Sequence, residues 1–252
     1  MITTNAQLIN DDCLSAMDEL IAQDRTFDAI ITDIPQEITQ NNWDNAITFD
    51  AMWKRLYRLR KNKNTPIILF SNQPFTTLLI SSNIKDFKYM LYWKKDRPSN
   101  FLNAKRQPLR DVEEIVVFYE KQCVYNPQMF EGKPLHGMGT KFKDKKHENN
   151  NYGDFASENN PSALRTGDTS KFPRQLLEFA KPHPPVHPTQ KPVELMEYLI
   201  KTYTNEGDNV LDFTAGSFST GVACLNTKRN FVGIELNKDY YEIGKRRMFG
   251  DE

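Results

Sequence analysis

Ala29-Ile30-Ile31-Thr32-Asp33-Ile34-Pro35-Gln36 is the stretch that decides the fold of this 252-residue chain. Its apolar, β-branched first half is typical of a buried parallel strand. Asp33 follows that strand directly, and Pro35 stiffens the turn after it. Open α/β sheets bind their ligands at the carboxyl ends of their strands. The stretch therefore predicts a central strand that presents a carboxylate to a binding site.

Short apolar segments alternate with helix-patterned segments along much of the chain, which favours a mostly parallel sheet. The expected strands are Thr4–Ile9, Ala29–Thr32, Pro66–Phe70, Lys88–Trp93, Ile115–Tyr119, Asn209–Phe213 and Asn230–Glu235. The expected helices are Cys13–Gln23, Phe49–Leu59, Gln73–Ser82, Val193–Thr204, Thr220–Asn226 and Asp239–Met248. We therefore predict an α/β fold, with a twisted, mostly parallel sheet, helices on both faces and a long insertion.

Composition narrows the classes of protein that fit. The 33 basic and 33 acidic residues cancel, so the overall charge does not indicate a polyanionic partner. Cys13, Cys123 and Cys224 lack the spacing of a zinc site or a disulfide framework, and we expect no bound metal. The chain shows no signal-peptide pattern and no apolar run long enough to span a bilayer. These features predict a soluble, cytoplasmic protein that is not exported.

The interval from Gln122 to Pro188 differs from the rest of the chain because it is rich in Asn, Lys, Gly and Pro. A structureless segment of this length inside a compact domain is usually functional or disordered. A region that reads a substrate is one interpretation, and a flexible solvated loop is the other. The sequence thus divides into residues 1–121, 122–188 and 189–252.

A second constellation lies near the C-terminus. The segment 210–217 reads Val-Leu-Asp-Phe-Thr-Ala-Gly-Ser, a predicted strand that ends in a turn of small residues before a helix. Such a turn brings the backbone close to a ligand, and an acid about 20 residues further on can hold ribose hydroxyls. Glu235 has that place, after the next predicted strand. The alternative is an ordinary strand-turn-helix with a glutamate at its edge.

Local charge supports nucleic-acid binding where overall charge does not. Between Lys85 and Arg110, basic residues exceed acidic ones by six. Phe87, Tyr92 and Phe101 are interleaved with them, which gives both phosphate contacts and stacking surfaces. The alternative is that the aromatic residues belong to the core and the lysines to a solvated face. The segment 100–110 is the better candidate for contact.

Several further motifs occur in a fixed order along the chain. They are Asn10-Asp11-Asp12-Cys13-Leu14, Asn42-Trp43-Asp44, Leu69-Phe70-Ser71-Asn72-Gln73-Pro74-Phe75, Phe101-Leu102-Asn103-Ala104-Lys105-Arg106-Gln107-Pro108-Leu109-Arg110, Tyr125-Asn126-Pro127-Gln128 and His187-Pro188-Thr189-Gln190-Lys191-Pro192. With the segments at 33–36 and 210–217, they resemble the DNA amino-methyltransferases of the β group, in which the catalytic motif precedes the cofactor motif. The phage-type adenine-N6 enzymes are the most similar branch.

This resemblance implies a Rossmann-like methyltransferase fold and transfer of a methyl group from S-adenosylmethionine to adenine N6 in double-stranded DNA. The target base must be flipped out of the duplex to be reached. The Asp33 carboxylate and the Ile34 carbonyl would then accept the two amine hydrogens. Residues 1–121 would carry this catalytic loop, 122–188 would recognise the target sequence, and 189–252 would bind the cofactor.

The resemblance also assigns site residues. The catalytic tetrapeptide is Asp33, Ile34, Pro35 and Gln36. The cofactor residues would be Asp12, Thr189, Gln190, Lys191, Asp212, Thr214, Gly216, Ser217, Phe218 and Glu235. From local charge rather than from the resemblance, the expected DNA-binding residues are Asn100, Lys105, Arg106, Arg110, Lys141 and Lys143. For two of these, simpler roles stay open: Asp12 as a helix N-cap, and Lys191 as part of a helix entry before Pro192.

The chain departs from the family pattern in both halves of the expected site. Gln36 stands where an aromatic residue usually stacks on the flipped base, a contact that contributes about 1–3 kcal/mol. Glu37 adds a negative charge where glycine is usual, close to the expected DNA backbone. Phe218 replaces a glycine of the cofactor loop, where close backbone approach is needed. Its side chain is expected either to enter the cofactor space or to cap it, which would weaken or abolish cofactor binding.

Three hypotheses follow. The first is an active adenine-N6 methyltransferase encoded by a phage or a bacterial host. The second is a catalytically impaired relative that binds DNA, a protein partner or the cofactor as a blocker or regulator. The third is a cytosine-N4 enzyme, which is disfavoured because such enzymes generally carry Ser in place of Asp33. A homodimer is a candidate assembly, since relatives in this group often dimerise.

Overall fold

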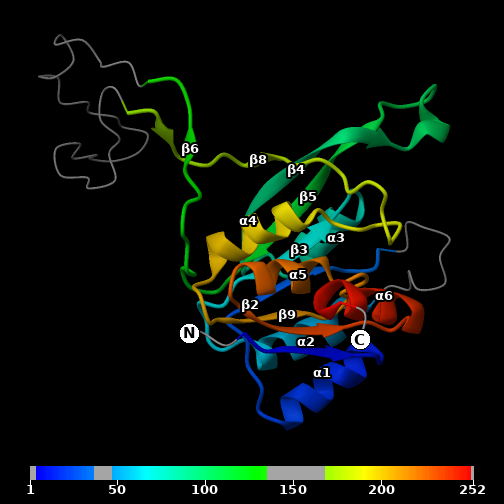
Figure 1. The fold of residues 1–252 in the computed structure, drawn as a ribbon, viewed down its shortest axis with the longest axis vertical. Helices are drawn as coiled ribbons and strands as arrows, with labels where there is room; N and C mark the ends of the chain where they lie inside the picture. The colour runs from blue at the N-terminus through cyan, green and yellow to red at the C-terminus, as the bar shows by residue number, and fades with distance from the viewer. Residues whose placement is uncertain (1–3, 37–46, 135–167, 251–252) are drawn as a thin grey trace, which may run out of the picture. The chain divides into compact units, whose positions relative to one another are not determined.

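The computed structural model describes residues 4–36, 47–134 and 168–250 (Figure 1). Its main element is a sheet with the strand order β1-β10-β9-β2-β3-β5-β4-β8. The strands are β1 (Ala6–Ile9), β2 (Ala29–Asp33), β3 (Ile67–Ser71), β4 (Phe87–Ser99), β5 (Arg110–Phe118), β8 (Leu176–Glu178), β9 (Asn209–Asp212) and β10 (Asn230–Ile234). The helices are α1 (Cys13–Ala22), α2 (Phe49–Leu59), α3 (Phe75–Ser82), α4 (Val193–Tyr203), α5 (Ser219–Asn226) and α6 (Lys238–Phe249).

Strand direction confirms the predicted sheet. β1, β10, β9, β2 and β3 run parallel to one another, while β5 is antiparallel to both β3 and β4. β2 occupies the centre, as its continuous apolar run predicts, and pairs with β9 on one side and β3 on the other. The two halves of the chain therefore meet at β2 and β9.

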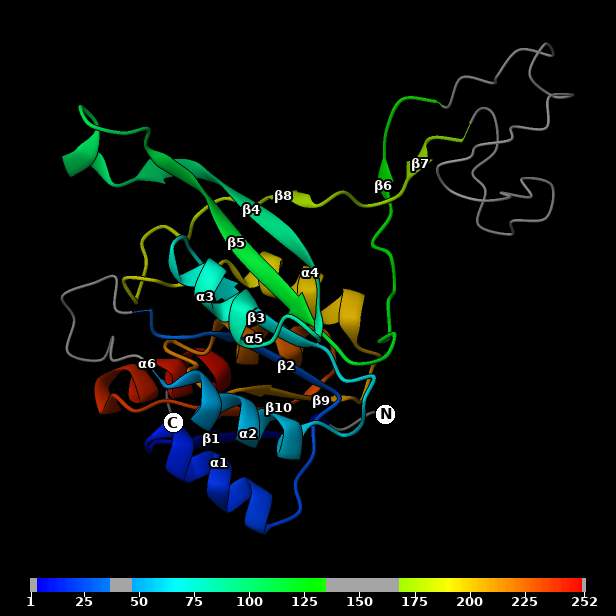
Figure 2. The same ribbon diagram turned by 180° about the vertical axis from the view of Figure 1, so that it is seen from behind.

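Helices cover both faces of this sheet (Figures 1 and 2). Successive residues of a strand point to opposite faces. In β2, Ile30 accordingly packs in the core that contains α1, α2 and α3, whereas Ala29 and Ile31 pack in the core that contains α4 and α5. Full burial of one such aliphatic side chain stabilises the fold by about 1.5–3 kcal/mol. In the described ranges, no helix is long and apolar enough to cross a membrane.

The paired strands β4 and β5 extend well beyond the body of the sheet (Figure 1). We call residues 94–112 the arm; a 3-10 turn, Phe101–Asn103, lies at its tip. The sequence predicted β4 only as far as Trp93, whereas the strand continues to Ser99. The apolar pattern stops at Trp93 because the arm leaves the core and its residues no longer need to be buried.

The predicted insertion contains a unit of its own, residues 127–174. In its described part, β6 (Phe130–Glu131) pairs antiparallel with β7 (Ser170–Lys171). The Arg174 guanidinium lies over the Phe130 ring, 5.9 Å from its centroid. Residues 175–188 belong instead to the main unit, where β8 pairs with β4. Lys141 and Lys143, predicted to bind DNA, lie outside the described residues.

Phe218 stands directly before α5 in a left-handed conformation, with φ 59° and ψ 36°. This region is strained for residues other than glycine. Its ring is fully buried and meets Phe231 and Tyr241 edge-on. Gly244 of α6 makes room for it, because a Cβ there would lie 2.0 Å from the Phe218 ring. The backbone thus keeps a glycine-like turn while the side chain is packed into the core.

This packing makes an unusual prediction for Gly244→Ala. Helix propensity alone would make the substitution favourable by about 1 kcal/mol. The overlap with Phe218 should reverse the sign, so that the free energy of unfolding falls by about 1–3 kcal/mol. Urea denaturation measures the change. In a Phe218→Ala background the loss should disappear, and an equal loss in both backgrounds would contradict the packing described.

Candidate active site

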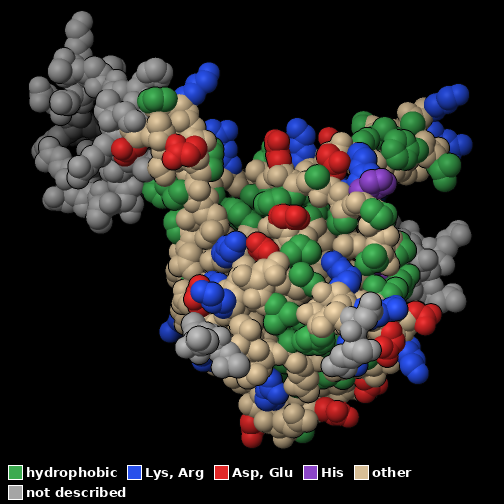
Figure 3. Space-filling model, viewed as in Figure 1, with side chains coloured by type: hydrophobic (Ala, Val, Ile, Leu, Met, Phe, Trp, Pro, Cys, Tyr) green, Lys and Arg blue, Asp and Glu red, His purple; other side chains and the backbone are tan. Residues whose placement is uncertain are grey.

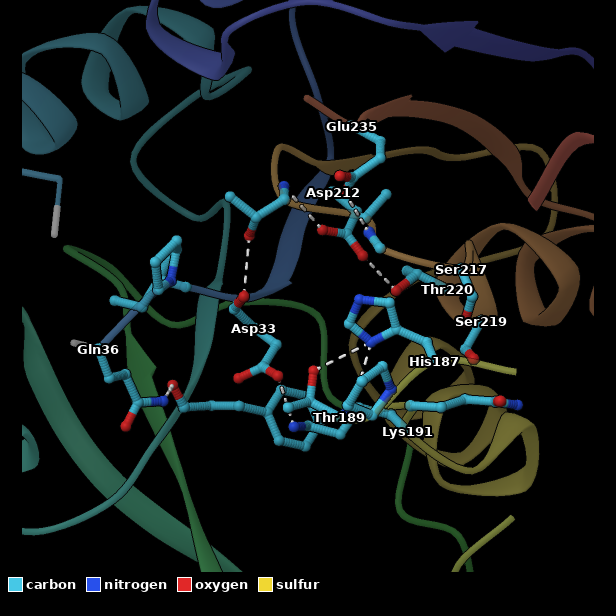
Figure 4. A pocket seen from close by; sticks show the side chains of 18 of the residues that line it. Asp33, Gln36, His187, Thr189, Lys191, Asp212, Ser217, Ser219, Thr220 and Glu235 are labelled. Atoms are coloured by element: carbon cyan, nitrogen blue, oxygen red, sulfur yellow. Dashed lines mark hydrogen bonds and ion pairs between the residues drawn. The ribbon is translucent and has the colours of Figure 1, made fainter. Parts of the chain in front are cut away.

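A cavity of about 540 Å³ opens at the carboxyl ends of β2, β3, β9 and β10 (Figure 4). This volume lies in the range of small-molecule and cofactor sites. Residues from both halves of the chain line it, including Asp33 from β2, Phe70 from β3, Asp212 from β9 and Glu235 after β10. The predicted convergence of polar groups at this edge of the sheet is therefore present in the structure.

A chain of buried charges forms one wall of the cavity. The Lys191 Nζ lies 2.6 Å from Asp33 Oδ2 and 2.6 Å from Glu113 Oε1. The second oxygen of Glu113 pairs with Lys95 Nζ at 2.7 Å. The side chains of Lys191, Glu113 and Lys95 are each at most 10% exposed, whereas that of Asp33 keeps 25% of its surface accessible. The two positive charges balance the two negative charges.

These contacts set the pKa values of the charged groups in this wall. Burial raises the pKa of the Asp33 carboxyl, and the Lys191 ammonium offsets this only in part. Burial also acts to raise the pKa of Glu113, but Lys191 and Lys95 outweigh it and hold that pKa below its usual value. Burial acts to lower the pKa of Lys191, but Asp33 and Glu113 raise it well above normal. Asp33 is thus the carboxylate of this wall that takes up a proton first as pH falls.

Asp212 ties the two halves of the site together. Its Oδ1 accepts hydrogen bonds from the Thr32 hydroxyl at 2.6 Å and the Thr214 amide at 3.2 Å, and its Oδ2 accepts from the Thr220 hydroxyl at 2.5 Å. The Thr214 hydroxyl donates to the Asp33 carbonyl at 2.9 Å. Burial raises the pKa of Asp212 to about 6. The network fixes the end of β2 relative to the loop after β9.

Glu235 organises the cofactor-like half of the cavity. Its Oε2 accepts a hydrogen bond from the Gly216 amide and its Oε1 accepts one from the Asn237 amide, both at 2.8 Å. Each carboxylate oxygen can still accept a further bond, because it has two acceptor positions. Gly216 has φ +54°, which a residue with a Cβ rarely adopts. Arg247 of α6 holds this loop through the Ser217 carbonyl and hydroxyl.

The segment 187–191 crosses the cavity from the opposite side. His187 Nδ1 accepts the Thr189 amide at 3.2 Å, and its ring meets Tyr240 edge-on with centroids 4.0 Å apart. The Gln190 side chain accepts the Val186 amide at 2.9 Å. The turn thereby presents Lys191 to Asp33 from the start of α4, where Figure 4 shows the two side chains meeting.

Gln36 is the last residue that the structure describes before residue 47. Its Oε1 accepts the Asn72 amide at 3.0 Å, and its Nε2 donates to the Phe70 carbonyl at 3.3 Å. The amide therefore connects the end of β2 to the end of β3 and forms part of the cavity wall. Its neighbour Glu37 and the motif Asn42-Trp43-Asp44 lie outside the described residues.

Most of the predicted site residues line this one cavity. They are Asp33, Ile34, Pro35, Gln36, Asp12, Thr189, Gln190, Lys191, Asp212, Thr214, Gly216, Ser217, Glu235 and, in the arm, Arg110. Asp12 is also the N-cap of α1, since its side chain accepts the amides of Leu14 and Ser15. Asn100, Lys105 and Arg106 lie in the arm, outside the residues that line the cavity.

Phe218 is the exception among the predicted cofactor residues. The expectation that its side chain enters or caps the cofactor space is wrong, because the ring packs under α6 and does not line the cavity. The neighbouring Ser217 and Ser219 do line it. The missing loop glycine is thus accommodated by Gly244, a residue that sequence reasoning did not connect with it.

Sequence reasoning missed Glu113 and misjudged Lys95. Glu113 belongs to no motif in the sequence, and Lys95 is one of several basic residues between Lys85 and Arg110. One pattern in the sequence could have indicated these two residues. In each of two neighbouring strands, charged residues adjoin an apolar run, at Trp93-Lys94-Lys95 and at Glu113-Glu114-Ile115. Only the antiparallel register of β4 and β5, which pairs Trp93 with Glu113, brings the two charges together.

Comparison with known proteins gives consistent results. A family model for N6 and N4 methyltransferases, described as DNA methylase, matches residues 23–246. The DNA adenine methyltransferase YhdJ of Escherichia coli is 27% identical over 96% of this chain and 82% of its own length. The crystal structure of an M1.HpyAVI complex with S-adenosylmethionine is 26% identical, with a TM-score of 0.65 over 96% of this chain and 99% of that one. The cytosine-N4-specific PvuII DNA methyltransferase shares the fold, with a TM-score of 0.65 over 99% of this chain and 88% of that one at 16% identity.

His187 predicts a measurable pH dependence of stability. Burial, Lys191 and Arg247 lower its pKa from 6.5 to about 4, so the unfolded state binds the proton more tightly. Stability must therefore be lost as pH falls from about 6.5 through 4, by an amount on the order of 3 kcal/mol. Urea denaturation of His187→Gln between pH 7 and pH 4 should show a flatter profile than the wild type. His183→Gln, which removes an exposed histidine, is the control; parallel profiles for wild type and His187→Gln would contradict the account.

Proposed function

Because the chain belongs to the family of N6 and N4 DNA methylases, we propose that it transfers a methyl group from S-adenosylmethionine to N6 of adenine in double-stranded DNA. The observation that carries this proposal is the Asp33 carboxylate, one oxygen of which is held by Lys191 at the wall of the cavity. An acid at this position favours adenine, since enzymes similar to this chain that act on cytosine N4 generally have Ser there. The relative YhdJ, named as an adenine methyltransferase, supports the same choice.

The residues of the cofactor half fit S-adenosylmethionine. Glu235 retains acceptor positions suited to ribose hydroxyls, and the backbone at Gly216 takes the conformation needed for close approach. The 540 Å³ cavity extends from Glu235 to Asp33 without obstruction by Phe218. The methionine end of the bound S-adenosylmethionine would then lie toward Thr189, Gln190 and Lys191. When bound, the cofactor supplies an electrophilic methyl group on a sulfonium.

Asp33 has a defined task in this proposal. Lys191 donates a hydrogen bond to Oδ2 of Asp33. Oδ1 of Asp33 can then accept one hydrogen of the target amine. The Ile34 carbonyl would accept the other hydrogen. These two acceptors concentrate electron density on the amine nitrogen as it forms the new bond to carbon and the carbon-sulfur bond breaks. The amine then gives up one proton to the Asp33 carboxylate, which passes it to solvent.

Lys191 keeps this carboxylate in place but also competes for it. Its ammonium is shared between Asp33 and Glu113 at equal distances of 2.6 Å, so Asp33 is not fully neutralised by a single partner. Removal of one member of such a buried group leaves an uncompensated charge, which typically costs about 3–5 kcal/mol. Catalysis by Asp33 therefore depends on the whole wall.

Gln36 favours a second candidate function, a catalytically impaired relative that binds DNA or a protein partner as a blocker or regulator. Its amide is bonded to the backbone of β3 and offers no π-face to a flipped base. We give the active enzyme precedence because the acceptor wall and the cofactor half both have the required groups. A homodimer and a cytoplasmic location stay predictions.

The direct test is transfer of label from tritiated S-adenosylmethionine to unmethylated DNA. Wild-type protein should label DNA, and Asp33→Ala should lower the rate at least about 100-fold, as loss of a key transition-state contact does. Calorimetry should show cofactor affinity within a few-fold of wild type in the variant. Asp18→Ala, which removes an exposed carboxylate, is the matched control. A folded wild type that binds the cofactor but labels no DNA would favour the impaired relative.

Glu113 predicts a shift in the pH profile. Its negative charge raises the pKa of Asp33, so Glu113→Gln should leave Lys191 more strongly paired with Asp33 and lower that pKa. The acid limb of the label-transfer rate reports ionisation of Asp33 and should move to lower pH in the variant. Glu178→Gln, which removes an exposed carboxylate beside Lys94, should keep the wild-type profile. A limb that stays in place, or moves to higher pH, would contradict the described coupling.

A further inference from the structure

The tip of the arm is an ordered structure rather than a loose loop. Asn100, at φ 71° and ψ 36°, turns the chain into the 3-10 segment Phe101–Asn103. The Asn103 amide donates to the Asn100 carbonyl at 3.1 Å, and the Asn103 side chain donates to the Asn100 side chain at 2.8 Å. The Arg106 amide then donates to the Asn103 carbonyl at 2.8 Å. These bonds fix the direction in which the side chains of the tip project.

Two large apolar side chains project from this ordered turn into solvent. Leu102 is 101% exposed and Phe101 is 65% exposed. Figure 3 shows apolar side chains gathered on the arm with blue, basic side chains around them. Lys105, Arg106 and Arg110 are exposed, and the sequence from residue 99 to residue 110 contains no carboxylate. An apolar point flanked by these cationic side chains suits a partner that is polyanionic outside and apolar inside.

The tip adjoins the cavity that contains Asp33. Ser99 and Arg110, which pair with each other where the tip begins, both line the cavity. Leu102 follows Ser99 by three residues, so their Cα atoms lie within about 11 Å of each other. Lys181 lines the cavity as well and lies close enough to Lys95 and Arg97 for their charges to lower its pKa, an effect that adds to that of its partial burial. The apolar point is thus next to the mouth of the cavity.

We propose that Leu102, with Phe101 beside it, is a wedge that enters the DNA base stack at the place vacated by the flipped adenine. This inference rests on the proposed function, because only an enzyme that extracts a base leaves such a gap. Flipping costs a few kcal/mol of lost stacking and pairing, and inserted apolar side chains are a known way to compensate. Lys105, Arg106 and Arg110 would hold the phosphates on either side.

The wedge predicts a substrate-dependent effect of Leu102→Ala. Label transfer to native duplex DNA should fall at least about 10-fold, because the gap is no longer filled. Transfer to the same DNA after heat denaturation should change less than about 3-fold, since an unpaired base needs no wedge. Leu102→Met, which keeps an apolar side chain of similar size, should restore most of the duplex activity. Ile84→Ala truncates another exposed aliphatic residue, which lies before the start of β4 and outside the arm, and should behave as wild type.

A second measurement, of DNA-binding affinity, tests the wedge independently of methyl transfer. Fluorescence anisotropy should show that wild-type protein binds a duplex with one abasic position at least about 5-fold more tightly than the intact duplex. The preference should vanish in Leu102→Ala, while Arg106→Ala should weaken binding to both duplexes alike. Absence of the preference in wild type would overturn the wedge even if DNA is methylated.

The outcomes separate the two proposals. Wild-type protein that labels neither native nor denatured DNA contradicts the proposed function, and the abasic preference then decides the wedge alone. Equal loss of transfer to both DNA forms in Leu102→Ala would overturn the wedge and leave the proposed function standing. A third outcome would also overturn the wedge and leave the proposed function standing. In it, wild type binds phosphatidylglycerol vesicles, Leu102→Ala does not, and the duplex activity of Leu102→Ala is unchanged. That outcome would identify the tip as a lipid contact.

Discussion

The site depends on one interaction, the placement of the Lys191 ammonium between the carboxylates of Asp33 and Glu113. Lys191 comes from the start of α4, Asp33 from the end of β2 and Glu113 from β5, so the contact joins elements that are distant in the sequence. Charges this deeply buried are stable only when they are paired and hydrogen-bonded. Lys95 supplies the remaining positive charge, and the wall as a whole is neutral. Asp33 is consequently held in one position with an oxygen available to a substrate.

A second constraint aligns this wall with the cofactor half. Asp212 is bonded to Thr32 on β2 and to Thr214 and Thr220 after β9, and Thr214 also contacts the Asp33 carbonyl. Reacting groups must be held in line for methyl transfer, and small displacements cost large factors in rate. The left-handed turn at Phe218 is part of the same constraint. Its strain is tolerated because the buried ring packs against Gly244, leaving the loop free to approach a ligand.

The sequence predicted the sheet and many of the polar residues that line the cavity, because apolar runs and turn residues are local signals. The strand Ala29–Thr32, which in the structure continues to Asp33, and the helix Phe49–Leu59 could be located from such patterns. Three features could not. The arm beyond Trp93 has no apolar alternation, Glu113 acquires its role only through the register of β4 and β5, and Phe218 is rescued by a glycine 26 residues away. Each depends on contacts between distant segments, which composition and periodicity do not encode.

The most direct measurement is the identity of the modified base. Unmethylated DNA is incubated with the protein and S-adenosylmethionine that carries a deuterated methyl group, digested to nucleosides and analysed by mass spectrometry. We expect deuterated N6-methyldeoxyadenosine, formed by wild type and absent with Asp33→Ala. Deuterated N4-methyldeoxycytidine would contradict the assignment of the target base. No labelled nucleoside from a folded protein that binds the cofactor would contradict the central claim that Asp33 activates an amine.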